Sequence, residues 1–181
     1  MYGNLLSNRQ ITQLKEAGQL FIGNFNPDSL RTTHYTLHPG RVLHRQEDGK
    51  WVGVHNFGEN SNPYVLEKDK YVVVEVKEQI QIRVDGIAGH FITASSNIED
   101  GLLIVAGQIG DKYGSNGEML RFGVKNLLEG KNHIDSNTRL AHVEFFDLRG
   151  VTLDPIKLSS TDELIRAIRR VRAVDDGPLP E

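Results

Sequence analysis

The sequence feature that most constrains the fold is a series of short apolar segments beyond Pro27, in which no helical period is present. Val, Ile, Tyr and Phe gather in stretches of a few residues, and turn residues such as Asp85-Gly86 separate them. Eight such stretches in about a hundred residues predict a β-sandwich or barrel rather than alternating strands and helices. The predicted strands are Tyr35–Leu37, Arg41–His44, Lys70–Val76, Gln79–Val84, His90–Ala94, Leu102–Ala106, Met119–Val124 and Ala141–Leu148.

A helix is predicted near the N-terminus. Ser7 is its expected N-cap, Gln10 is the capping-box partner three residues later, and Gly18 supplies the stop. Leu6 and Ile11 stand at the positions of a hydrophobic staple.

The end of the chain changes character again. Ser160-Thr161-Asp162-Glu163 is a second capping box, and Leu164, Ile165, Ile168 and Val171 follow at helical spacing. We therefore expect a mainly β domain over residues 1–150 and a C-terminal helix with a tail over residues 151–181.

Composition excludes several classes of function. The chain of 181 residues has no cysteine, which removes disulfides, thiolate catalysis and zinc sites that need sulfur ligands. Its net charge of −3 argues against a nucleic-acid polymer as partner. No signal-peptide pattern and no long apolar run is visible, so we expect no membrane contact and a cytoplasmic protein.

The seven histidines are dispersed and predict no metal site. His34 and His38 fall on one face of a predicted strand, but four strand residues separate them by about 13 Å, too far to share one metal ion. His90 and His142 lie in apolar strands, where a hydrogen-bonded core or interface histidine is the usual outcome.

Two polar segments follow apolar strands and are candidates for binding. In Gly101–Tyr113 a strand enters a glycine-broken turn that holds Gln108, Asp111 and Lys112, where one acid beside one base would suit proton transfer. A plain β-turn explains the same residues. Ser95-Ser96 ends another strand and suits either phosphate binding or a helix cap.

The order of several motifs resembles the dCTP deaminase branch of the trimeric dUTPase-like superfamily. The stretch from Leu30 to Leu37 is similar to the family's Pro-Ala-Ser-Tyr-Asp-Leu segment, and Ser95-Ser96 falls at its Arg-Ser-Ser-Leu-Ala-Arg motif. Ala106–Tyr113 resembles the Ile-Asp-Pro-Gly-aromatic turn. Asn126 matches an asparagine that ends the next strand, and Arg139-Leu140-Ala141-His142 is similar to the late Arg-Ile-Ala-Gln strand.

The resemblance implies a distorted β jelly-roll (a dUTPase-like β-clip), a homotrimer with sites shared between subunits, and a deoxypyrimidine nucleotide as partner. It implies a nucleotide hydrolase, either one that deaminates dCTP to dUTP or a dUTPase-like one, and both reactions need a carboxylate that activates water. No protein-bound cofactor is expected, and Mg²⁺ enters only with a nucleotide triphosphate. The candidate catalytic residues are Asp111 and Glu118, and the candidate substrate-binding residues are Ser95, Ser96, Gln108, Lys112, Tyr113 and Arg121.

The sequence differs from the family pattern at the catalytic and phosphate-binding positions. Gly110 stands at the turn aspartate, with Asp111 one residue late, and the deaminase glutamate falls in the acid-free window Leu120–Gly123. Ala94 and Glu99 replace the arginines that flank Ser95-Ser96. Two hypotheses stay open: a nucleotide enzyme with a displaced base, or a catalytically degenerate trimeric protein with a binding, regulatory or structural role.

Overall fold

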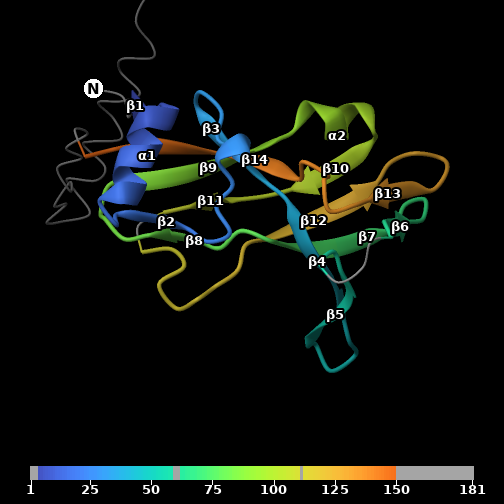
Figure 1. Cartoon of the computed structure of the whole chain (residues 1–181). Helices are drawn as coiled ribbons and strands as arrows, with labels where there is room; N and C mark the ends of the chain where they lie inside the picture. The colour runs from blue at the N-terminus through green and yellow to red at the C-terminus, as the bar shows by residue number, and fades with distance from the viewer. Residues whose placement is uncertain (1–3, 59–61, 111, 150–181) are drawn as a thin grey trace, which may run out of the picture. The chain divides into compact units, whose positions relative to one another are not determined.

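The computed structural model describes residues 4–58, 62–110 and 112–149, and it is mainly β (Figure 1). One five-stranded sheet has the order β1-β14-β9-β11, with β3 also paired to β14. All of its pairings are antiparallel. Its strands are β1 (Asn4–Leu5), β3 (His34–Leu37), β9 (Ile87–Thr93), β11 (Gln108–Ile109) and β14 (Ala141–Asp147).

The second five-stranded sheet has the order β10-β12-β7-β4-β5 and is also antiparallel throughout. It is formed by β4 (Pro39–Arg45), β5 (Trp51–Asn56), β7 (Tyr71–Val76), β10 (Leu102–Val105) and β12 (Arg121–Asn126). Two small sheets pair β2 (Leu20–Ile22) with β8 (Ile80–Ile82) and β6 (Tyr64–Leu66) with β13 (Asn132–Ile134).

The predicted N-terminal helix is present as α1 (Asn8–Glu16), with the capping box between Ser7 and Gln10 formed in both directions. Leu6 and Ile11, the staple residues, are both buried. Gly18 follows the helix with φ +69°, a conformation that glycine adopts without steric cost. The two other helical elements are a 3₁₀ turn (Pro27–Ser29) and α2 (Ser95–Glu99).

The hydrophobic core lies where the inner faces of the sheets meet α1. Strand β14 alternates buried and partly exposed residues, as expected for a strand with one face on the core. Tyr35, Phe122 and Phe145 are the largest fully buried side chains. Packing on this core fixes strands β3, β9 and β14. Most of the segments that resemble the family motifs lie in these strands or directly beside them.

All eight predicted strands overlap observed strands, so the mainly β prediction is confirmed; the predicted ends differ by a few residues. Six further strands were not predicted: β1, β2, β5, β6, β11 and β13. They are short, or, like β5, they expose apolar side chains and contain glycine, so their sequences lack the usual alternation.

One expectation for the histidines was wrong. Strand β3 ends at Leu37, so His38 lies between strands and does not share a strand face with His34. His90 is exposed on β9, where it pairs with Gln108 of the short strand β11, so it is not a core residue, and a place in an interface stays a prediction.

Among the described helices, none is long and apolar enough to cross a membrane. The helix predicted from Ser160 and the rest of 151–181 lie outside the described residues.

Candidate functional site

Three segments that are distant in sequence meet at one edge of the first sheet. Strand β3 pairs with the start of β14, and Thr36 stands directly opposite His142. The Leu140 amide donates to the Leu37 carbonyl at 2.9 Å. The segments that resemble the family's Tyr-Asp-Leu and Arg-Ile-Ala-Gln motifs are therefore neighbours.

Helix α2 is attached to the same edge by Asn97. The side-chain amide of this buried residue donates to the carbonyl of Arg139 at 2.9 Å and to that of Leu140 at 2.8 Å. Ser95 and Ser96 form the first turn of α2, with Ser95 exposed and Ser96 partly exposed. The structure thus attaches the helix that carries the predicted binding residues Ser95 and Ser96 to the backbone of Arg139 and Leu140.

Two histidines lie together on this edge. The rings of His34 and His142 have centroids 4.3 Å apart, and His142 Nδ1 is 3.1 Å from Thr36 Oγ1. Burial lowers the pKa of His142 to about 4, and the neighbouring His34 adds to the effect. Burial also lowers the pKa of His34. Both rings are therefore neutral at pH 7 in the free protein.

Arginines surround the pair. Arg31 and Arg139 are exposed, have no ion-pair partner among the described residues, and both depress the pKa of His142. We call Arg31, His34, Thr36, Arg139 and His142 the β3–β14 cluster. Unpaired arginines and polarisable imidazoles beside serine hydroxyls form a surface that suits a phosphate group.

The loop between β11 and β12 carries most of the other predicted site residues. Gln108, Lys112 and Glu118 are exposed, whereas Tyr113 is half-buried and packs on the core. The Gly114 amide donates to Glu118 Oε2 at 3.4 Å. Burial raises the pKa of Tyr113, and the negative charge of Glu118 raises it further.

Asp111, the other catalytic candidate, lies outside the described residues. Within those residues, no group of three or more His, Cys, Asp or Glu side chains is placed to hold a metal ion.

Arg121 is committed to an ion pair that the sequence did not reveal. Its Nε donates to Glu75 Oε2 at 3.1 Å, and Arg41 Nε donates to Glu75 Oε1 at 2.6 Å. Glu75 is buried, with 4% of its surface exposed, and it pairs in register with both arginines across three adjacent strands. An acidic residue in a strand is ordinarily expected to face solvent, whereas β7 is buried on both faces from Val72 to Val76, so no local pattern identified this ion triplet.

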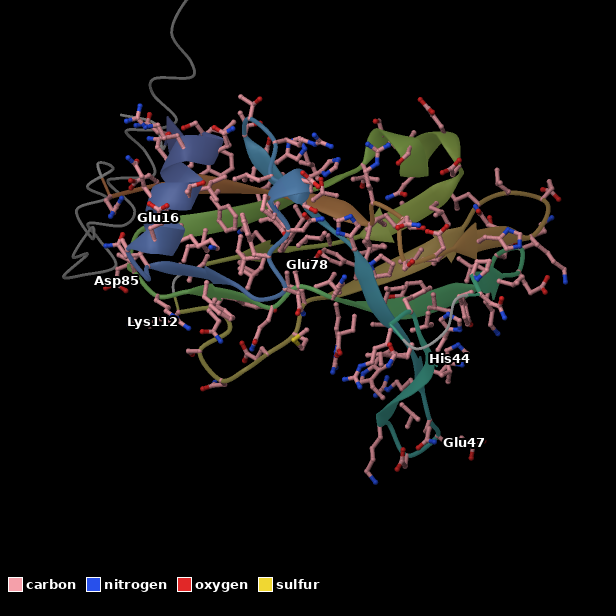
Figure 2. All side chains as sticks on the ribbon, viewed as in Figure 1. Glu16, His44, Glu47, Glu78, Asp85 and Lys112 are labelled. Carbon is pink, nitrogen blue, oxygen red and sulfur yellow. The ribbon has the colours of Figure 1, made fainter. Side chains whose placement is uncertain are left out.

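Glu78 is a second buried acid that sequence reasoning missed. Its carboxylate accepts the His38 amide and the His38 Nδ1, both at 2.9 Å. Both contacts tie the end of β3 to the segment after β7, which gives Glu78 a structural role (Figure 2).

No residue of the segment Leu120–Gly123, where the family's deaminase glutamate is expected, offers a free carboxylate. Leu120 and Phe122 are buried, Arg121 binds Glu75, and a Cβ on Gly123 would collide with the ring of Tyr71 on the neighbouring strand. A glutamate side chain at Gly123 therefore fits only if Tyr71 moves.

Asn126, matched to a family asparagine, has a structural role in this chain. It is fully buried, and its side chain donates to the carbonyls of Leu66 and Gly130 and accepts from the Leu128 amide.

The predicted site residues form two groups in one chain. Figure 1 shows α2 and the loop between β11 and β12 well apart, and Figure 2 places Lys112 far from the α2 end. Ser95 and Ser96 belong to the first group, and Lys112, with its chain neighbour Tyr113, belongs to the second. Gln108 lies between the groups: it pairs with His90 in the first sheet, and the same row of that sheet continues through Glu144 to His34.

Comparisons with known proteins locate the fold. No protein-family model matches the sequence, and no curated protein sequence matches it. Among solved structures, the 2'-deoxycytidine 5'-triphosphate deaminase of Agrobacterium tumefaciens is similar with a TM-score of 0.63 and 14% identity. The match covers 81% of this chain and 49% of the deaminase chain, so the chain spans less than half of that structure.

Two phage proteins are also similar. A dUTPase from phage phi11 of S. aureus matches with a TM-score of 0.49 and 13% identity over 76% of this chain and 96% of its own. A dUTPase mutant from Staphylococcus bacteriophage 80alpha matches with a TM-score of 0.49 and 14% identity, again over 76% of this chain and 96% of its own. The chain has the dUTPase-like β-clip fold, as the sequence predicted.

Proposed function

We propose that this chain is one subunit of a homotrimer that binds a deoxypyrimidine nucleotide at sites shared between subunits. In this proposal the β3–β14 cluster, with Ser95 and Ser96, holds the phosphates. The loop 108–118 of a neighbouring subunit, with Arg121, contacts the base.

The observation that carries the proposal is the convergence of β3, α2 and β14. Hydrogen bonds from Asn97 and the pairing of Thr36 with His142 gather two exposed arginines and two serines on one edge. The family's own phosphate cations are replaced by Ala94 and Glu99, so Arg31 and Arg139 supply the charge that a triphosphate needs.

The separation of the two groups supports a shared site. A nucleotide spanning the cluster and the loop of the same chain would have to cross the distance between them, whereas a neighbouring subunit can bring its loop to the cluster. The likeness to a deaminase structure favours the same arrangement by analogy.

We propose that the chain binds the nucleotide but does not catalyse the deamination of dCTP that the family resemblance implies. The acid-free window Leu120–Gly123 leaves water without the general base that attack on C4 requires. Deamination of dCTP stays the second candidate, because Glu118 lies beside Tyr113 and within reach of the Gly114 amide.

Mg²⁺ enters this proposal only with the triphosphate. Thr36 stands where the similar family segment has an aspartate, and a hydroxyl is a weaker ligand for Mg²⁺ than a carboxylate.

A panel experiment tests the proposal. The protein is incubated with dCTP, dUTP and their ribo- and diphosphate relatives, with and without Mg²⁺. Thermal shift reports binding, and uracil formation or pyrophosphate release reports turnover. We expect a shift with a deoxypyrimidine triphosphate and no turnover. Turnover lost in Glu118→Gln establishes the enzyme instead, and no shift with any nucleotide removes nucleotides as ligands.

A further inference from the structure

Arg41 and Glu75 line a pocket that the nucleotide proposal does not use. Arg121, which that proposal does use, bonds Glu75 and is not among the pocket's lining residues. The volume of the pocket is about 270 Å³, and its walls come from β4, β5, the end of β7 and the segment before β14. Arg41, Asn56, Glu75 and Lys77 are its polar lining residues from the second sheet, and Ser136 adds a hydroxyl.

A bulge in β4 creates the polar wall. Pro39 pairs with Val76 and Arg41 pairs with Glu75, so Gly40 is the extra residue in the ladder. A Cβ on Gly40 would lie 3.0 Å from the carbonyl of Val76, so this close approach of the two strands depends on glycine. The bulge places Arg41 directly opposite Glu75.

Glu75 fixes Arg41 by its Nε alone. The Nε donates to Glu75 Oε1 at 2.6 Å, and no hydrogen bond within the described residues occupies the two Nη groups. Half of the Arg41 side-chain surface is exposed, whereas Glu75 is buried. Burial of the Glu75 carboxylate between two arginines costs desolvation free energy. In return, the carboxylate holds the Arg41 guanidinium in a fixed position.

Lys77 adds a second cation to the pocket. It follows Glu75 by two residues, and its ammonium has no ion-pair partner in the described part of the chain. Its backbone amide is anchored to the His38 carbonyl at 2.8 Å. Arg41 and Lys77 against Glu75 leave the lining of the pocket with one positive charge in excess, and Arg121 offsets the charge of Glu75 from outside the lining.

We infer that this pocket, centred on Arg41 and Lys77, binds a small phosphate anion, either free or as the phosphomonoester group of a small metabolite. The free Nη groups provide the planar pair of donors that matches a phosphate edge, and Lys77 adds a point charge. The volume is below the 300–1,000 Å³ or so of sites for drug-sized ligands, which favours a small anion over a whole nucleotide.

Calorimetric titration of the full chain with inorganic phosphate tests the inference. We expect Arg41→Gln and Lys77→Gln each to weaken phosphate binding about tenfold, as the loss of one charge-assisted contact predicts. Arg45→Gln is the matched control, because Arg45 lies on the same strand outside the pocket, and its side chain donates to the Gly49 carbonyl. Lys77→Gln removes no buried contact, so its effect is independent of any destabilisation caused by Arg41→Gln.

Several outcomes overturn the inference. One is an unchanged affinity in both pocket variants, and another is an equal loss in Arg45→Gln, which indicates nonspecific attraction. Stronger binding of acetate or citrate than of phosphate assigns the pocket to carboxylates instead. If only Arg139→Gln weakens phosphate binding, the phosphate binds at the β3–β14 cluster and not in this pocket. The Lys77→Gln variant should keep its nucleotide thermal shift, which separates this inference from the proposed function.

Discussion

Thr36 Oγ1 lies 3.1 Å from His142 Nδ1, although 106 residues separate them in sequence. The two residues face each other in the pairing of β3 with β14. This contact joins two of the segments that resemble family motifs, and it keeps a partly buried imidazole beside the exposed Arg31 and Arg139. The free energy of unfolding and the binding of anions should both depend on it.

Stability should fall in mild acid because of His142. Burial lowers the pKa of this histidine from 6.5 to about 4 in the folded chain, so between these values the unfolded chain takes up a proton that the folded chain does not. The free energy of unfolding should therefore decrease by about 1–2 kcal/mol as pH falls through this window, after allowance for solvent screening of the partly exposed ring.

Urea unfolding of the wild type and of His142→Gln between pH 7 and pH 4 measures this dependence. In the His142→Gln variant, the free energy of unfolding should fall less steeply as the pH decreases, because the contribution of His142 is gone. Parallel stability curves for the two proteins would show that His142 is not responsible.

Asn97→Ala should weaken both the fold and the candidate phosphate surface. The change leaves the carbonyls of Arg139 and Leu140 without the donor that holds α2, at a cost of about 1–3 kcal/mol. Nucleotide affinity should drop as well, because Ser95 and Ser96 lose their fixed place beside Arg139. Urea unfolding and nucleotide titration measure the two effects.

Asn137→Ala is the control for Asn97→Ala, since Asn137 is exposed in a turn. If both variants bind nucleotide with wild-type affinity, α2 takes no part in the site.

Gly114→Ala should be strongly destabilising. Gly114 has φ +76°, and an added Cβ would collide with the carbonyl oxygen of Ile80. We expect a loss of about 2–4 kcal/mol in the free energy of unfolding. Gly130→Ala is matched to it, because nothing lies within 4 Å of a Cβ there, and its effect should stay within about 0.5 kcal/mol. Equal effects of the two substitutions would contradict the tight packing of the loop against β8.

The strands were predictable where one face packs on the core. Residues 141–145 alternate because the inner residues are buried, and the helix over Asn8–Glu16 was predicted from its capping box. Strand β5 was missed because it exposes Trp51, Val52 and Val54, so burial imposes no period on its sequence.

The candidate site was predictable only in part. The family resemblance predicted Ser95 and Ser96 as substrate-binding residues, which stays a prediction. The attachment of their helix to the backbone of Arg139 depends on Asn97, a contact across more than forty residues. Glu75 could not be predicted as a buried ion-pair partner, because its two arginines come from strands 34 and 46 residues away. Such pairings depend on sheet register, which local sequence does not encode.

A subunit-mixing experiment tests the shared nucleotide site most directly. Arg139→Gln removes one of the two cations of the β3–β14 cluster, and Tyr113→Ala disrupts the loop. Each homotrimer alone should bind dCTP or dUTP at least tenfold more weakly than wild type. After the two variants are unfolded and refolded together, about one site in four should combine an intact cluster with an intact loop from a neighbouring subunit. The account predicts that this fraction recovers wild-type affinity. No recovery in mixed trimers, or a wild-type chain that is monomeric and binds no nucleotide, would contradict it.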